Sequence, residues 1–172
     1  HRGSFNITQP VDYLAHCLRS VVERVPNLDA AEIEDVITGV GMPEGCQGMN
    51  MSRIAAMAAG FPKEVAATSV NRFCSSGSQA IMMAAHSILH EGAEVAIGAG
   101  VETITMMQDG TQNTTRMVNK TAQARFPGLY FPMGVTAEVV AERYKVSRED
   151  QDRYALQSQQ RYAAASTKGW IA

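Results

Sequence analysis

Strand-like and helical patterns of apolar residues alternate along the first half of the chain. Residues 11–25 carry apolar side chains at helical spacing with charged side chains between them, which predicts an amphipathic helix entered through Pro10 and ended by Pro26. Short apolar runs bounded by glycine or turn residues predict buried strands at 35–40, 67–70 and 94–101. Capping residues and glycines predict a short helix after Asp29 and longer ones at 50–59 and 74–90. Such alternation through short links predicts βαβ units, and therefore an α/β fold whose parallel or mixed sheet is covered on both faces.

The helix predicted at 74–90 is unusual because it contains no Asp, Glu, Lys or Arg. A helix without a charged face must be covered on all its faces. One sheet covers only one face, so we expect this helix to lie between two layers.

The pattern changes after Glu102. Residues 106–130 show little periodicity and are rich in Thr, Asn and Gln, which predicts an irregular excursion. Order resumes with a helix at 136–144, and Ser147-Arg148-Glu149-Asp150 predicts a capping box at the start of a last helix that ends near Ser166.

Composition narrows the classes of partner. The chain has 172 residues, 45% of them apolar and 19% charged, as in a globular protein of one domain or one domain and part of another. The formal net charge of −2, without a basic stripe, argues against nucleic acid as a partner. No apolar run approaches the ~20 residues that span a bilayer, so we expect no membrane span. Because the first residue is His1 and both ends look cut, we expect the chain to be part of a longer protein.

The three cysteines, Cys17, Cys46 and Cys74, form no Cys-x-x-Cys pair and have no metal-ligand spacing, so no metal site is predicted. An odd number of cysteines without a signal peptide favours a reducing compartment. Cys17 lies on the first predicted helix and Cys46 in a glycine-rich loop. Both are predicted to be structural.

Cys74 differs by its position, since it lies where the β-branched run at 67–70 gives way to the uncharged helix. Unpaired backbone N–H groups and the positive end of the macrodipole favour a thiolate at such a helix start, and the thiolate is the nucleophilic form of cysteine. Gly77, one turn later, leaves space beside the sulfur, and the Cys74 N–H is a candidate oxyanion donor. The local pattern alone fits a nucleophile and a buried structural cysteine equally well.

A thiolate nucleophile also needs a base and an acid. His86 and His90 lie too far along the predicted helix to reach Cys74, and His16 lies on the first helix without ligand spacing. We therefore expect these groups to come from chain outside residues 1–172, or the protein not to turn over. Gly98-Ala99-Gly100 lacks the third glycine of a dinucleotide-binding fingerprint, so no nucleotide cofactor is predicted.

The chain resembles the thiolase family, especially the degradative 3-ketoacyl-CoA thiolases (acetyl-CoA C-acyltransferases). The resemblance covers essentially all 172 residues through segments in the family's order. These are residues 2–5, 43–50 with 53–56, 71–77 (Asn-Arg-Phe-Cys-Ser-Ser-Gly), 98–102, 132–138 and 147–152. Any one of them is a weak signal, but six in order are specific.

The resemblance implies that Cys74 accepts the acyl group as a thioester, that its N–H is one arm of an oxyanion hole, and that Met133 lines the acyl pocket. It implies two lobes stacked as α-β-α-β-α layers, with residues 1–105 as the first lobe without its first strand. Residues 106–172 would begin the inserted loop domain that binds coenzyme A, and the C-terminal lobe lies outside the chain. Acyl-CoA and CoA are then substrates, no separate cofactor is needed, and a homodimer or homotetramer is expected. The bacterial cytoplasm is the expected compartment, with the mitochondrion and the peroxisome as alternatives.

The departures from the family pattern limit what these residues can do. The Asn-Glu-Ala-Phe, Gly-His-Pro and Cys-x-Gly-x-Gly motifs, which supply the family's activating histidine, acid/base cysteine and other oxyanion donors, do not occur in residues 1–172. We therefore expect these residues alone to be inactive. Ser78 stands where a leucine is usual, and Pro132 replaces the histidine of the short-chain biosynthetic branch, which favours a degradative enzyme.

The predicted reaction of the parent protein is thiolytic cleavage of 3-ketoacyl-CoA to acetyl-CoA and a shortened acyl-CoA. The alternatives are a ketosynthase of the same superfamily, and a non-catalytic thiolase-like protein of lipid binding or assembly.

Overall fold

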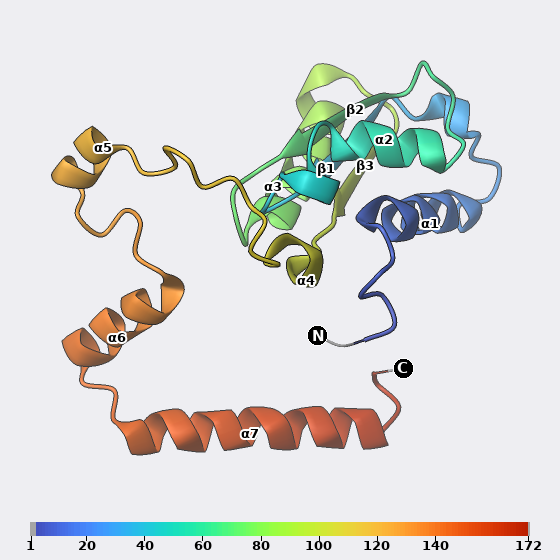
Figure 1. Ribbon diagram of the computed structural model, residues 1–172. Coiled ribbons are helices and arrows are strands. Elements are labelled where there is room, and N and C mark those ends of the chain that lie inside the picture. Colours follow the sequence, from blue (N-terminus) through green and yellow to red (C-terminus); the bar gives the residue numbers. More distant parts are fainter. Residues whose placement is uncertain (1–2, 172) are drawn as a thin grey trace. The chain divides into compact units, whose positions relative to one another are not determined.

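The computed structural model describes residues 3–171, which form two compact units (Figure 1). The first unit ends at Asn113 and the second begins at Thr114. Each is described by itself. The division into a lobe at 1–105 and a loop domain at 106–172 stays a prediction about the family's domains.

The first unit alternates helices and strands as the apolar pattern predicts. Its elements are α1 (Pro10–Glu23), η1 (Ala30–Glu32), β1 (Asp35–Gly39), η2 (Gly45–Gln47), α2 (Met51–Ala58), β2 (Ala66–Val70), α3 (Ser76–His86), the π-helical η3 (Ser87–Glu91), β3 (Ala96–Gly100) and α4 (Ile104–Met107). The expected caps form: Asp29 and Glu32 make a complete capping box at η1, and the Asn50 side chain accepts a hydrogen bond from the Arg53 N–H at the start of α2.

The sheet is parallel, with strand order β2-β1-β3. In this register Gly39 of β1 lies opposite both Val70 of β2 and Gly100 of β3. The carboxyl ends of all three strands therefore meet at one edge, which is where parallel α/β sheets place their ligand sites.

Helices cover both faces of the sheet. On one face, Val36 and Val40 pack with residues of α1 and α2, among them Leu14, Met51 and Ala55. On the other face, Ile37 packs with Ala80 and Ala84 of α3. Alternate residues of β1 thus face opposite layers, as the period of a strand requires.

Helix α3 lies so close to the sheet that two strand positions facing it have to be glycine. A Cβ on Gly39 would lie 2.5 Å from the Gly77 nitrogen and closer still to the Ser76 carbonyl group. A Cβ on Gly98 would lie 2.7 Å from the Ile81 Cα. Real Cβ atoms do not approach backbone this closely, so side chains at these two strand positions would push α3 off the sheet.

The structure corrects one expectation for the uncharged helix. Its first helical residue is Ser76, not Cys74, because residues 72–75 form turns before the helix begins. Its outer face is exposed within residues 3–171, where Ile81 is 61% and Leu89 71% exposed, and a second layer over that face stays a prediction about the full-length protein. The first unit contains one sheet, and this sheet packs against the inner face of α3 only.

The second unit contains α5 (Lys120–Arg125), α6 (Met133–Tyr144) and α7 (Arg148–Thr167). The stretch expected to be irregular, 106–130, holds α5 and the end of α4, because the Asn119 side chain caps α5 by accepting a hydrogen bond from the Ala122 N–H.

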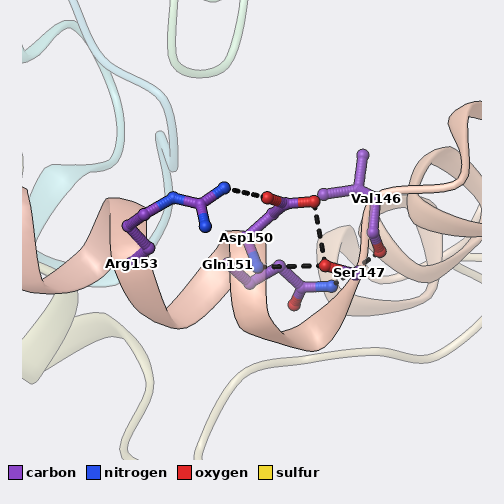
Figure 2. Close-up of polar contacts among 5 residues, drawn as sticks. All are labelled: Val146, Ser147, Asp150, Gln151 and Arg153. Carbon is purple, nitrogen blue, oxygen red and sulfur yellow. Dashed lines mark hydrogen bonds and ion pairs between the residues drawn. The ribbon is translucent and has the colours of Figure 1, made fainter.

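Only half of the predicted capping box forms at α7 (Figure 2). The Ser147 hydroxyl accepts a hydrogen bond from the Asp150 N–H at 3.1 Å and donates one to the Asp150 carboxylate at 2.8 Å. The Asp150 carboxylate also pairs with Arg153, so it serves these two partners. The hydrogen bond from Ser147 holds the pKa of Asp150 below its usual value, with Arg153 adding to the effect.

Candidate active site

Cys74 lies at the carboxyl edge of the sheet, between the end of β2 and the first residue of α3. The residue is exposed and its thiol is free. The predicted placement in a strand-to-helix turn is therefore confirmed, although the sulfur lies two residues before the helix.

A network of hydrogen bonds holds the turn that presents Cys74. The Asn71 side chain accepts a hydrogen bond from the Phe73 N–H at 2.8 Å. The Ser76 hydroxyl accepts one from the Arg72 N–H at 2.8 Å and donates one to the Phe73 carbonyl oxygen at 2.6 Å. Phe73 itself has a φ of 46°, in the left-handed region, which costs a non-glycine residue about 1–3 kcal/mol. The neighbouring side chains therefore fix a backbone conformation that Phe73 would not adopt alone.

Substituting Ser76 by alanine is expected to destabilise the protein by about 1–2 kcal/mol. The substitution removes a hydroxyl that bonds both the Arg72 N–H and the Phe73 carbonyl oxygen, and Ser76 is buried at 3% exposure. Urea denaturation of the full-length protein measures the change. Ser75→Ala is the matched control: Ser75 is the N-cap residue of α3 but its side chain makes no capping hydrogen bond, so a change below about 0.5 kcal/mol is expected. Equal effects of the two substitutions would contradict this account of the turn.

Two backbone N–H groups near the Cys74 sulfur form hydrogen bonds within the turn. The Ser75 and Ser76 N–H groups donate to the carbonyl oxygens of Arg72 and Phe73 at 3.0 Å each. Within the described residues, the Cys74 N–H is not among these donors. It stays the candidate oxyanion donor.

Cys74 opens on a cavity of about 580 Å³ formed at the carboxyl edge of the sheet. Glycines at the strand ends and at the start of α3 make room for it, and Met42, Val101 and Ile104 give it an apolar wall. Glu102 is the charged residue of its lining. A cavity with a largely apolar wall can admit an acyl chain beside the sulfur.

Sequence reasoning assigned no role to Glu102 and Gln47, which meet beside this cavity. Glu102 Oε2 accepts a hydrogen bond from the Gly41 N–H at 2.7 Å, and Glu102 Oε1 accepts one from the Gln47 side chain at 2.5 Å. Both residues lie within segments that carry the family resemblance, and this was the sequence signal that could have pointed to them. Their contact joins positions 55 residues apart, so no local pattern reveals it.

Tyr13 of α1 lies against the same segment. Its hydroxyl donates to the Glu102 carbonyl oxygen at 3.4 Å. Partial burial raises the pKa of the Tyr13 hydroxyl above its ordinary value, so the group stays protonated and able to donate.

The other candidates lie apart from the sulfur. His86 is the last residue of α3 and His90 lies in η3, so about 15 Å of helix or more separates them from Cys74. Cys17 is exposed on α1, and the Cys46 thiol faces the Met107 sulfur at 3.8 Å.

Met133 is the first residue of α6, in the second unit, and is 71% exposed. It lines a hollow of about 440 Å³ together with Ala137 and Gln151 of the same unit. Its role in the acyl pocket stays a prediction.

Residues 3–171 contain no group of three or more His, Cys, Asp or Glu side chains placed to hold a metal ion. Within the same range, no helix combines the length and the apolar character that crossing a membrane requires.

Comparisons with known proteins identify the family of the chain. The family described as "Thiolase, N-terminal domain" matches residues 1–171. The chain is 42% identical over 171 residues to 3-ketoacyl-CoA thiolase 2, peroxisomal, of Arabidopsis thaliana, covering 98% of this chain and 36% of that protein. It is 39% identical over 168 residues to the 3-ketoacyl-CoA thiolase of Bacillus subtilis (strain 168), covering 98% and 42%. The chain thus spans less than half the length of these relatives.

A solved structure shows the same fold. The crystal structure of the Bacillus anthracis acetyl-CoA acetyltransferase matches with a TM-score of 0.76 and 31% identity, covering 98% of this chain and 44% of that one. The predicted thiolase-like α/β fold is confirmed. Family match, sequence relatives and fold agree: the chain belongs to the thiolase family and carries its N-terminal domain.

Proposed function

We propose that the full-length protein cleaves 3-ketoacyl-CoA thiolytically into acetyl-CoA and a shortened acyl-CoA. The observation that carries this proposal is the position of Cys74: a free, exposed thiol at the carboxyl edge of a parallel sheet, opening on a cavity with an apolar wall. The relatives named 3-ketoacyl-CoA thiolase support thiolysis over the ketosynthase and the non-catalytic alternatives.

The proposed reaction has two half-reactions. The Cys74 sulfur attacks the 3-keto carbon, a C–S bond forms, and the C2–C3 bond breaks. Its electron pair takes up a proton to give acetyl-CoA. The thiol of free CoA then attacks the thioester carbon, the bond to Cys74 breaks, and the thiol of Cys74 recovers its proton. A covalent intermediate between two substrates gives ping-pong kinetics.

In this scheme the Cys74 N–H supports the negative charge that develops on the carbonyl oxygen. The proton transfers are assigned to a histidine and a second cysteine outside residues 1–172, as in the family pattern. The exposed outer face of α3 supports a second lobe at that face, since the family stacks its lobes there.

The test is to trap the intermediate. The full-length protein is incubated with a 3-ketoacyl-CoA without free CoA, and peptides are examined by mass spectrometry. We expect the acyl group on the peptide that contains Cys74, its loss when CoA is added, and no acyl group on Cys17 or Cys46. A polypeptide limited to residues 1–172 is expected to show no turnover. Acylation that persists in Cys74→Ala would contradict the proposal.

We further propose that CoA and acyl-CoA are the partners, without a separate cofactor, and that the protein forms a homodimer or homotetramer. Three free cysteines suit a reducing compartment. The relatives include plant peroxisomal and bacterial thiolases. Of these two settings we propose the bacterial cytoplasm.

A further inference from the structure

We propose that Glu102 is a positioning residue, which acts through Gly41 and Gln47 to hold the loop that walls the Cys74 cavity. The inference deepens the proposed function and rests on it where it concerns the reaction. Its structural part, the control of the surroundings of the sulfur, does not depend on the acyl chemistry.

The two partners of the Glu102 carboxylate are both donors. The Gly41 N–H lies 2.7 Å from Oε2 and the Gln47 amide nitrogen 2.5 Å from Oε1. A carboxylate offers an acceptor to each of them, whereas a glutamine offers one acceptor and must turn its NH₂ group toward a donor. The site is therefore specific for the carboxylate at position 102.

The orientation of the Gln47 amide is fixed by its surroundings. The side chain is fully buried, its oxygen accepts from the Thr103 N–H at 2.5 Å, and its nitrogen donates to the Met42 carbonyl oxygen at 2.9 Å and to Glu102. The Thr103 partner is a donor and the other two are acceptors, so a reversed amide would lose all three bonds. Gln47 thus connects both ends of the loop that follows β1 to the segment that follows β3.

Gly41 carries the effect to the cysteine turn. A Cβ on Gly41 would lie 2.6 Å from Glu102 Oε2 and 3.4 Å from the Phe73 carbonyl oxygen, so Gly41 lies against both the carboxylate and the residue before Cys74. Phe73 is the left-handed residue of the turn. Met42, the next residue of the loop, lines the cavity together with Glu102 and Cys74. Loss of the carboxylate therefore releases Gly41 and Met42 beside the sulfur.

The test uses three variants of the full-length protein and one control. Glu102→Gln keeps the shape and loses one of the two acceptors. Gln47→Glu places two carboxylates at hydrogen-bond distance. The double variant Gln47→Glu/Glu102→Gln restores the contact with the polarity reversed. In the double variant the amide at 102 accepts from the Gly41 N–H and donates to the carboxylate at 47, which still accepts from the Thr103 N–H. The carboxylate at 47 cannot donate to the Met42 carbonyl oxygen, so the expected recovery is partial. Glu44→Gln is the control, because Glu44 is an exposed carboxylate of the same loop.

The first measurement is steady-state thiolysis. We expect kcat to fall about tenfold in Glu102→Gln and about 100-fold in Gln47→Glu, with KM for CoA within about twofold, since a misplaced reacting group lowers the rate without changing remote binding. The double variant is expected to recover at least about tenfold over Gln47→Glu, because contacting residues couple by up to about 3 kcal/mol. Glu44→Gln should match the unmodified protein.

The second measurement needs no acyl-CoA. Iodoacetamide labelling of Cys74 is measured relative to Cys17 in the same molecule. We expect this ratio to change at least about threefold in Glu102→Gln and to shift back toward the unmodified value in the double variant. A labelling ratio that is unchanged in Glu102→Gln overturns the proposal. So does a double variant whose loss of kcat equals the product of the losses in the two single variants. If the unmodified protein forms no acyl-Cys74, the proposed function fails and the labelling ratio alone decides on Glu102.

Discussion

Cys74→Ala in the full-length protein is expected to lower kcat for thiolysis at least about 10⁴-fold, the scale on which removal of a covalent nucleophile acts. The sulfur forms the bond to the acyl group, and no other described thiol opens on its cavity. The loss should appear in kcat because the bond exists only along the reaction path, and kinetics with 3-ketoacyl-CoA and CoA measure it.

Two substitutions serve as matched controls. Cys17→Ala and Cys46→Ala each remove a thiol of the same chemistry, one exposed on α1 and one facing Met107. Both variants should keep kcat within about threefold, since neither thiol lines the cavity of Cys74. Thermal unfolding checks that all three proteins are folded. Activity in Cys74→Ala within 100-fold of the unmodified protein would show that the sulfur is not the acyl acceptor.

The second large effect is expected at Gly39. Gly39→Ala should destabilise the protein by about 3 kcal/mol, the upper range for overpacking a tight core. The added Cβ would lie 2.5 Å from the Gly77 nitrogen and closer to the Ser76 carbonyl group. These atoms are backbone and cannot rotate away, so the start of α3 must move off the sheet. Because Cys74 lies two residues before that start, acyl transfer should fall with stability.

Gly100→Ala is the control for this substitution, because Gly100 lies opposite Gly39 in the sheet. A Cβ there would meet the Gly77 Cα at 3.5 Å, which is ordinary van der Waals contact. Its effect on the free energy of unfolding is expected to stay below about 1 kcal/mol. Urea denaturation of both variants measures the difference. Equal stability of the two variants would mean that α3 does not lie as close to β1 as the structure shows.

Local patterns predicted the elements that surround the site. The apolar period of α1, the capping residues Asp29 and Asn50, and the glycine-bounded strands all act through neighbours a few positions away, so they can be read from the sequence. The same holds for the place of Cys74 between a strand and a helix. The start of α3 was predicted two residues too early because the turn before it depends on the Ser76 hydroxyl.

The sequence by itself determined the α/β class, the order of elements and the family, since periodicity, caps and ordered motifs are local properties of the chain. Only the tertiary structure decided which side chains surround Cys74. The left-handed Phe73 and the contact between Gln47 and Glu102 exist because the parallel register brings the ends of β1, β2 and β3 to one edge. Hydrogen bonds between residues more than 50 positions apart have no local signal, because their partners become neighbours only when the sheet forms.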